Sequence, residues 1–142
     1  MTRPRDIGTQ AETAVVHYLQ THGWPHAERR ALRGTQDAGD ITGTPGVCWE
    51  VKAGKAAETA GDRTIERWLR ETQHEAENAR AEWGVLVVKR VGHGMRSVGN
   101  WWAIIPLSDL VADGVNAPAS DPFVPVRLTL APLCQMLYDL GY

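Results

Sequence analysis

The stretch GDITGTPGVCWEVKA, residues 39–53, places three ionisable side chains within two short apolar runs. Side chains alternate between the two faces of a strand, so Glu50 and Lys52 share one face and their apolar neighbours take the other. If the runs pair as a hairpin around Thr-Pro-Gly, Asp40 comes close to Glu50, because directly opposed Cβ atoms lie about 5 Å apart. Two carboxylates that close repel each other unless a positive charge lies between them.

A divalent metal ion would supply that charge. Mg²⁺ takes oxygen ligands at about 2.1 Å, and Mn²⁺ is a possible substitute. The ammonium of Lys52 could then hold a phosphate oxygen or orient an attacking water. The pattern Asp-x(9)-Glu-x-Lys therefore favours metal-assisted phosphodiester hydrolysis. The alternative is a cross-strand salt bridge, in which Lys52 neutralises Asp40 and Glu50 on a solvated sheet face.

Two further polar residues lie near the apolar faces of the expected helices. Glu12 lies on or beside an apolar stripe and is a candidate third acid of the site. It also fits a capping box with Thr9, in which it would reach back to the Thr9 backbone N–H. Gln73 lies at the edge of the inner face of a later helix, where its amide could bind a phosphate or a metal-bound water, or could simply be a boundary residue.

The elements that must position these residues follow from hydrophobic periodicity. Helices are expected at 9–23 and 64–83, and a polar loop at 54–63. Strands are expected within 25–32 and at 39–43, 47–53, 85–90 and 101–107. Beyond them we expect a short helix from Ser108, an irregular segment at 117–125 and a terminal helix at 131–142. This order predicts a mixed α/β fold with one central β-sheet flanked by helices.

Composition indicates an ordinary globular domain. The chain has 142 residues, of which 43% are hydrophobic and 23% charged, and we expect one domain over residues 1–142. No apolar run approaches the roughly 18 residues of a membrane span, and the first residues do not resemble a secretory signal. Cys48 and Cys134 are far apart in sequence and are expected to be reduced core residues. These features predict a cytoplasmic protein with no membrane partner.

The formal net charge of −2 is unevenly distributed along the chain. Residues 84–106 contain three cations and no acid, and three arginines cluster just before the 39–53 stretch. Such polarity allows phosphate binding on one face. The candidate DNA contacts are Arg29, Arg30, Arg33, Lys55, Lys89, Arg90 and Arg96. One of the adjacent Trp101 and Trp102 must point outward, where its ring could stack on a base or bury a dimer contact.

Other common catalytic sites lack support in the sequence. The five histidines and two cysteines show no zinc-ligand spacing. No glycine-rich loop matches a phosphate-binding or dinucleotide-binding motif, and no serine lies in a nucleophile elbow.

Together, Glu12 on a first helix, Gly39-Asp40 on a strand, Glu50-Val51-Lys52 on the next strand and Gln73 on the following helix resemble the PD-(D/E)XK nuclease superfamily. The similarity is greatest to its small Holliday-junction-resolvase-like branch and covers residues 7–106, which leaves 107–142 as a C-terminal extension. One departure is that Gly39 stands where the motif has proline.

The resemblance implies a restriction-endonuclease-like core and specific roles for the motif residues. Asp40, Glu50 and the Val51 carbonyl would hold Mg²⁺, and Lys52 would assist the attacking water. Glu12 would be an additional acidic site residue and Gln73 an auxiliary one. A homodimer is also implied, because a resolvase must cut two strands of a four-way junction symmetrically.

We therefore expect a metal-dependent, structure-selective DNA endonuclease, with Holliday junctions as the first candidate substrate. Two alternatives stay open. The chain could be a nuclease of the same superfamily that acts on other DNA, such as a nickase, an exonuclease or a restriction-type enzyme. It could also be a non-catalytic DNA-binding module that keeps the fold and uses its acids in salt bridges.

Overall fold

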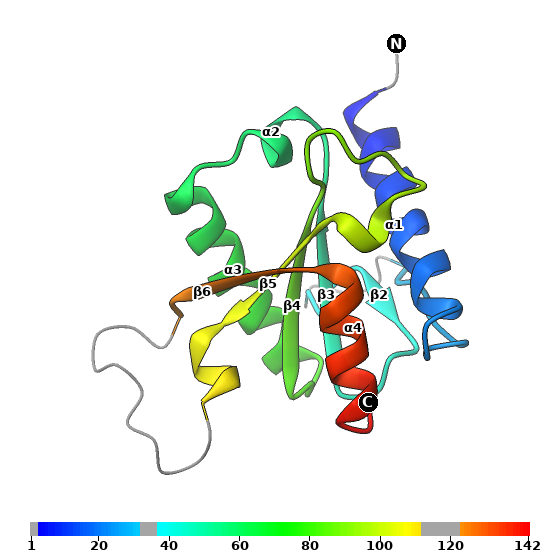
Figure 1. Ribbon diagram of the computed structural model, residues 1–142, viewed down its shortest axis with the longest axis vertical. Helices are drawn as coiled ribbons and strands as arrows, with labels where there is room; N and C mark the ends of the chain where they lie inside the picture. Colours follow the sequence, from blue (N-terminus) through cyan, green and yellow to red (C-terminus); the bar gives the residue numbers. More distant parts are fainter. Residues whose placement is uncertain (1–2, 32–36, 112–122) are drawn as a thin grey trace.

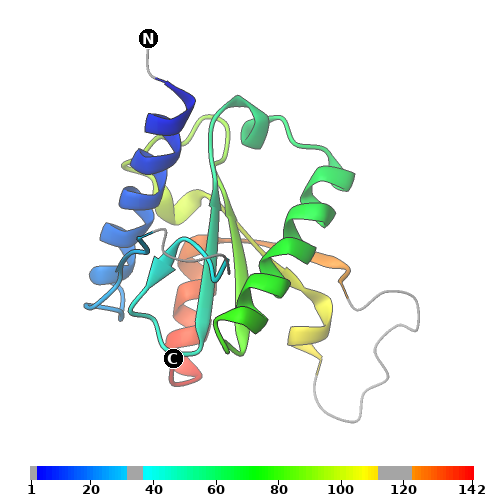
Figure 2. The ribbon, with the colours of Figure 1, turned by 180° about the vertical axis from the view of Figure 1, so that it is seen from behind.

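The computed structural model describes residues 3–31, 37–111 and 123–142. Its centre is a mixed four-stranded sheet in the order β3-β4-β5-β6, with helices on both faces (Figures 1 and 2). The strands are β3 (Val47–Lys52), β4 (Trp83–Val88), β5 (Trp102–Pro106) and β6 (Pro125–Thr129). β3 and β4 are parallel, whereas β5 is antiparallel to both of its neighbours. The predicted mixed α/β fold, with a central sheet flanked by helices, is confirmed.

Two hydrophobic clusters hold the helices on the sheet. One face packs against α1 (Pro4–Gln20) and α4 (Leu130–Asp139), and Trp49 and Trp101 are completely buried there. The other face packs against α2 (Lys55–Glu58) and α3 (Asp62–Asn78) through a smaller cluster that includes Leu69. Short 3₁₀ turns, η1 (Val98–Asn100) and η2 (Leu107–Leu110), flank β5. The described part of the chain contains no helix long and apolar enough to cross a membrane.

The boundaries of the two long helices differ from the prediction. α1 begins at Pro4, five residues earlier than expected, because proline suits a first helical position, where its missing N–H has no intrahelical partner. α3 ends at Asn78, five residues earlier than expected. Arg80 then takes a left-handed conformation with φ of 54°, and Trp83 belongs to β4.

The predicted hairpin between 39–43 and 47–53 is wrong in its pairing. β2 (Ile41–Thr42) pairs with β1 (Glu28–Arg29) in a separate two-stranded sheet, so β2 and β3 form no ladder. Gly43 permits the pairing with β1, because a Cβ there would lie only 2.0 Å from the carbonyl oxygen of His26. The chain at Gly43 is thus pressed against the segment that leads into β1.

Residues beyond the resemblance contribute to the core. β6 pairs with β5 along all five of its residues, and α4 buries Leu130, Leu133 and Leu137 against the sheet. The terminal helix was predicted, but β6 was not. Both cysteines are buried free thiols, as predicted, and burial raises the pKa of each to about 12.

Candidate functional site

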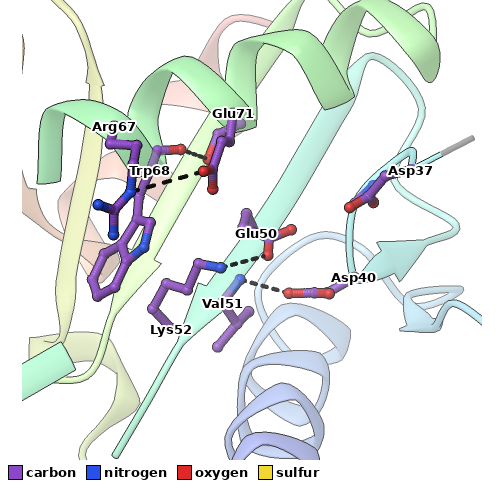
Figure 3. A network of polar contacts seen from close by, with 10 residues as sticks. Asp37, Asp40, Glu50, Val51, Lys52, Arg67, Trp68 and Glu71 are labelled. Carbon is purple, nitrogen blue, oxygen red and sulfur yellow. Dashed lines mark hydrogen bonds and ion pairs between the residues drawn. The ribbon is translucent and has the colours of Figure 1, made fainter. Parts of the chain in front are cut away.

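Asp40 is fixed against β3 by its main chain and by its side chain. Its N–H donates to the carbonyl oxygen of Trp49 at 2.8 Å, and its Oδ2 accepts from the N–H of Val51 at 2.8 Å (Figure 3). This places the carboxylate beside Glu50 without a hairpin ladder. The contact of Val51 in this structure is through its N–H, so metal binding by its carbonyl stays a prediction.

The predicted alternation along β3 is confirmed. Trp49 and Val51 belong to the cluster beneath α1 and α4, whereas Glu50 and Lys52 lie on the opposite face, toward α3. Lys52 Nζ lies 3.3 Å from Glu50 Oε1 and 5.5 Å from the ring centroid of Trp68. The ammonium is therefore held beside one carboxylate and over an aromatic ring of α3.

Two acids that the sequence interpretation did not select complete a cluster around Glu50. One carboxylate oxygen from each of Asp37, Glu50 and Glu75 lies within 4.8 Å of the other two. They come from the segment before β2, from β3 and from α3, and Glu50 and Glu75 are buried. We call these three residues the acidic triad. It could hold a metal ion, since carboxylate oxygens are the preferred ligands of hard divalent cations.

The electrostatics of the site favour a bound cation. Glu50 Oε2 and Glu75 Oε2 are buried and have no hydrogen-bond partner among the described residues. Burial and the neighbouring Glu50 raise the pKa of Glu75 to about 10, and the same two causes raise the pKa of Asp40 to about 7. Carboxylates that are buried side by side are costly to ionise together, because the ion pair with Lys52 neutralises only one charge, and a divalent cation would remove that cost.

No family model, curated protein or solved structure matches this chain. What the site can do is therefore inferred from its own residues. The salt-bridge alternative accounts for one contact, between Lys52 and Glu50. A single ammonium cannot neutralise Asp40 and the acidic triad together, so cation binding explains more of the arrangement.

Glu12 lies close enough to Asp40 for its charge to contribute to the raised pKa of Asp40. Its Oε2 accepts from Arg29 Nε at 2.9 Å, and this ion pair ties α1 to β1. The capping-box alternative is wrong, because α1 begins at Pro4 and Thr9 therefore lies inside the helix. Glu12 stands at the border of the site, engaged by an arginine.

Replacing Glu12 with glutamine is expected to lower the free energy of unfolding by less than about 1 kcal/mol, because partly exposed ion pairs contribute little. Urea denaturation at neutral pH measures this, with Glu28→Gln on exposed β1 as the matched control. A loss above about 2 kcal/mol would show that Glu12 has a structural role beyond this pair.

Gln73 serves a contact between α3 and β4. Its Nε2 donates to the carbonyl oxygen of Gly84 at 2.9 Å, and a Cβ on Gly84 would lie 2.9 Å from the same nitrogen. The amide is thus used in packing, and an auxiliary role toward phosphate or water stays a prediction.

Among the predicted DNA contacts, three basic residues interact within the chain. Arg29 is paired with Glu12, and Lys89 with Glu58 of α2. The guanidinium carbon of Arg90 lies 4.1 Å from the ring centroid of Trp102. The side chains of three others are exposed, namely Arg30, Lys55 and Arg96. Arg33 lies outside the described residues.

Proposed function

We propose that the chain is a divalent-metal-dependent nuclease that hydrolyses phosphodiester bonds in DNA. The observation that carries the proposal is the convergence on Glu50, where the acidic triad, the anchored carboxylate of Asp40 and the ammonium of Lys52 meet. The order of Glu12, Asp40, Glu50 and Lys52 along the chain, which resembles the PD-(D/E)XK pattern, supports the same activity.

Each group has a defined task in this proposal. Asp40 and Glu50 bind Mg²⁺ or Mn²⁺, with Asp37 and Glu75 as the additional carboxylates within reach of Glu50. The bound cation supplies charge neutralisation at the phosphate and a more acidic water. Lys52 donates to a non-bridging phosphate oxygen or orients the attacking water. The ring of Trp68 restricts where the ammonium can move.

The finer proposal concerns the substrate. We infer that the chain acts on branched DNA, with the four-way junction as the first candidate, and works as a homodimer whose two-fold axis matches the junction. Both inferences rest on the resemblance to the resolvase-like branch. Size-exclusion chromatography with light scattering measures the oligomeric state directly.

A cleavage assay on matched substrates tests the proposal. A labelled four-way junction, a linear duplex with the same arm sequence and a single strand are incubated with Mg²⁺, Mn²⁺ or EDTA. Paired nicks on the junction alone would support the resolvase activity. Cutting of linear DNA would support a nuclease of another substrate class. Binding without any metal-dependent product would favour the non-catalytic DNA-binding module. In such a module Glu12 and Glu50 would serve in their ion pairs with Arg29 and Lys52.

A further inference from the structure

Trp102 lies on the same sheet face as the acidic triad. Lys52 pairs in register with Val88 of β4, and Val88 pairs with Trp102 of β5. Residues directly opposite one another in neighbouring strands point to the same face of a sheet. Strands are spaced about 4.8 Å apart, so the backbones of Lys52 and Trp102 are about 10 Å apart. Val88, between them, is buried in the cluster under α2 and α3, so a nucleic-acid strand that contacts both residues would pass over these helices and not along the sheet itself.

Two arginines lie against the indole of Trp102. The guanidinium carbons of Arg90 and Arg127 lie 4.1 Å and 5.0 Å from its ring centroid. Arg90 follows β4 and Arg127 lies in β6, so the guanidinium groups reach β5 from its two neighbouring strands. Within the described residues, neither guanidinium forms a salt bridge with a carboxylate, and Arg127 is exposed. This stack of Arg90, Trp102 and Arg127 thus holds two cations in place without neutralising their charge.

A cleft of about 420 Å³ opens next to this stack, between the start of α3 and the β5–β6 edge of the sheet. It is lined by Asp62, Ile65, Glu66, Ile104, Pro125 and Arg127. Ile65 and Ile104 form its buried floor, and Pro125 is a partly exposed apolar wall. Beside them, the planar cation of Arg127 suits a flat ring, and the two carboxylates accept hydrogen bonds from amino groups. The same carboxylates repel a phosphate. The lining therefore fits a nucleobase with an exocyclic amine better than it fits a phosphate group.

We propose that this cleft binds an unpaired, amino-bearing base of a DNA strand, with Arg127 stacked on the base and Arg90 beside the strand's backbone. The inference deepens the proposed nuclease function, on which it rests for the path of the strand toward Lys52. Bases in a duplex are stacked on their neighbours and their Watson–Crick edges are paired. The substrate class is therefore branched DNA in which a base at the branch point, next to the cleavage position, is unpaired.

Binding in EDTA tests the inference separately from cleavage. Fluorescence anisotropy compares labelled single strands of about 12 nucleotides, all cytosine or all thymine, with a blunt duplex of equal length. Thymine has no exocyclic amine, so the cytosine strand is expected to bind most tightly. Arg127→Gln is expected to weaken that binding about tenfold, because stacking on one base is lost. Arg5→Gln, an exposed arginine of α1, removes the same charge and is expected to have little effect.

Two further variants separate base stacking from simple charge. Arg127→Lys keeps the charge but not the planar group, so the tenfold defect is expected to persist; recovery of binding would overturn the inference. Neutralising both acids, Asp62→Asn with Glu66→Gln, is expected to reduce the preference for cytosine over thymine. If this double variant instead binds all strands more tightly, or if wild type binds all three DNAs equally, a phosphate occupies the region. Melting temperatures confirm that each variant is folded.

The two proposals fail in different ways. Selective binding of the cytosine strand without any metal-dependent cleavage would contradict the proposed nuclease function and support the base site. Cleavage by wild type, together with unchanged DNA binding by Arg127→Gln, would contradict the base site and support the proposed nuclease function.

Discussion

Replacing Glu50 with glutamine is expected to reduce Mg²⁺-dependent DNA cleavage at least about 1000-fold, a loss of about 4 kcal/mol of transition-state stabilisation. Glu50 belongs to the acidic triad and also lies beside Asp40 and Lys52. Glutamine keeps the shape of the side chain but removes its charge, so the proposed metal site loses the carboxylate that lies beside all of its other acids. Cleavage of a labelled DNA substrate under single-turnover conditions measures the effect.

The matched control is Glu71→Gln on the exposed face of α3, where Glu71 Oε1 lies 4.0 Å from Arg67 Nε. This variant is expected to cleave at the wild-type rate. Glu50→Gln should bind DNA normally in EDTA and should melt no earlier than wild type. The loss of the ion pair with Lys52 is offset, because the repulsion of Glu50 with Asp40 and Glu75 is also removed. Cleavage by Glu50→Gln at the wild-type rate would show that the metal site is assigned to the wrong residues.

The chemistry of β3 was predictable because it depends on local rules. Strand alternation alone separates Trp49 and Val51 from Glu50 and Lys52, and the structure has the same division. The closeness of Asp40 to Glu50 was predicted by a hairpin that does not form. It arises from hydrogen bonds between Asp40 and β3, which keep the carboxylate near the same place.

The acidic triad could not be predicted in the same way, because it depends on packing between distant segments. Glu75 lies three residues after the buried Thr72 and directly before the buried Ala76. Its spacing from these apolar-face residues indicates that the side chain of Glu75 faces the sheet. Helical periodicity does not indicate which strand that side chain contacts. β6 was missed because its proline removes a strand hydrogen-bond donor, so pairing with β5 was not apparent from the local pattern.

The metal-free protein is expected to lose stability as pH rises from 5 to 8, mainly through Glu75. Burial and Glu50 raise the pKa of Glu75 in the folded protein to about 10, from 4.5. The folded protein therefore retains a proton that the unfolded chain releases. The resulting stabilisation is fully present below pH 4.5 and is lost as pH rises toward 10. Urea denaturation in EDTA is expected to show a decrease of about 4 kcal/mol between pH 5 and pH 8.

Glu75→Gln tests the origin of this dependence, because its amide is neutral at every pH. The variant is expected to be more stable than wild type at pH 8 in EDTA and to vary less with pH, while Glu71→Gln behaves as wild type. Adding Mg²⁺ at pH 8 should stabilise wild type in proportion to the logarithm of metal concentration and stabilise Glu75→Gln much less. If Mg²⁺ stabilised both proteins equally, Glu75 would be the group that holds the buried proton but would not be a metal ligand. A wild-type stability that is the same at pH 5 and pH 8 would instead mean that the carboxyl group of Glu75 is not buried beside Glu50 in solution.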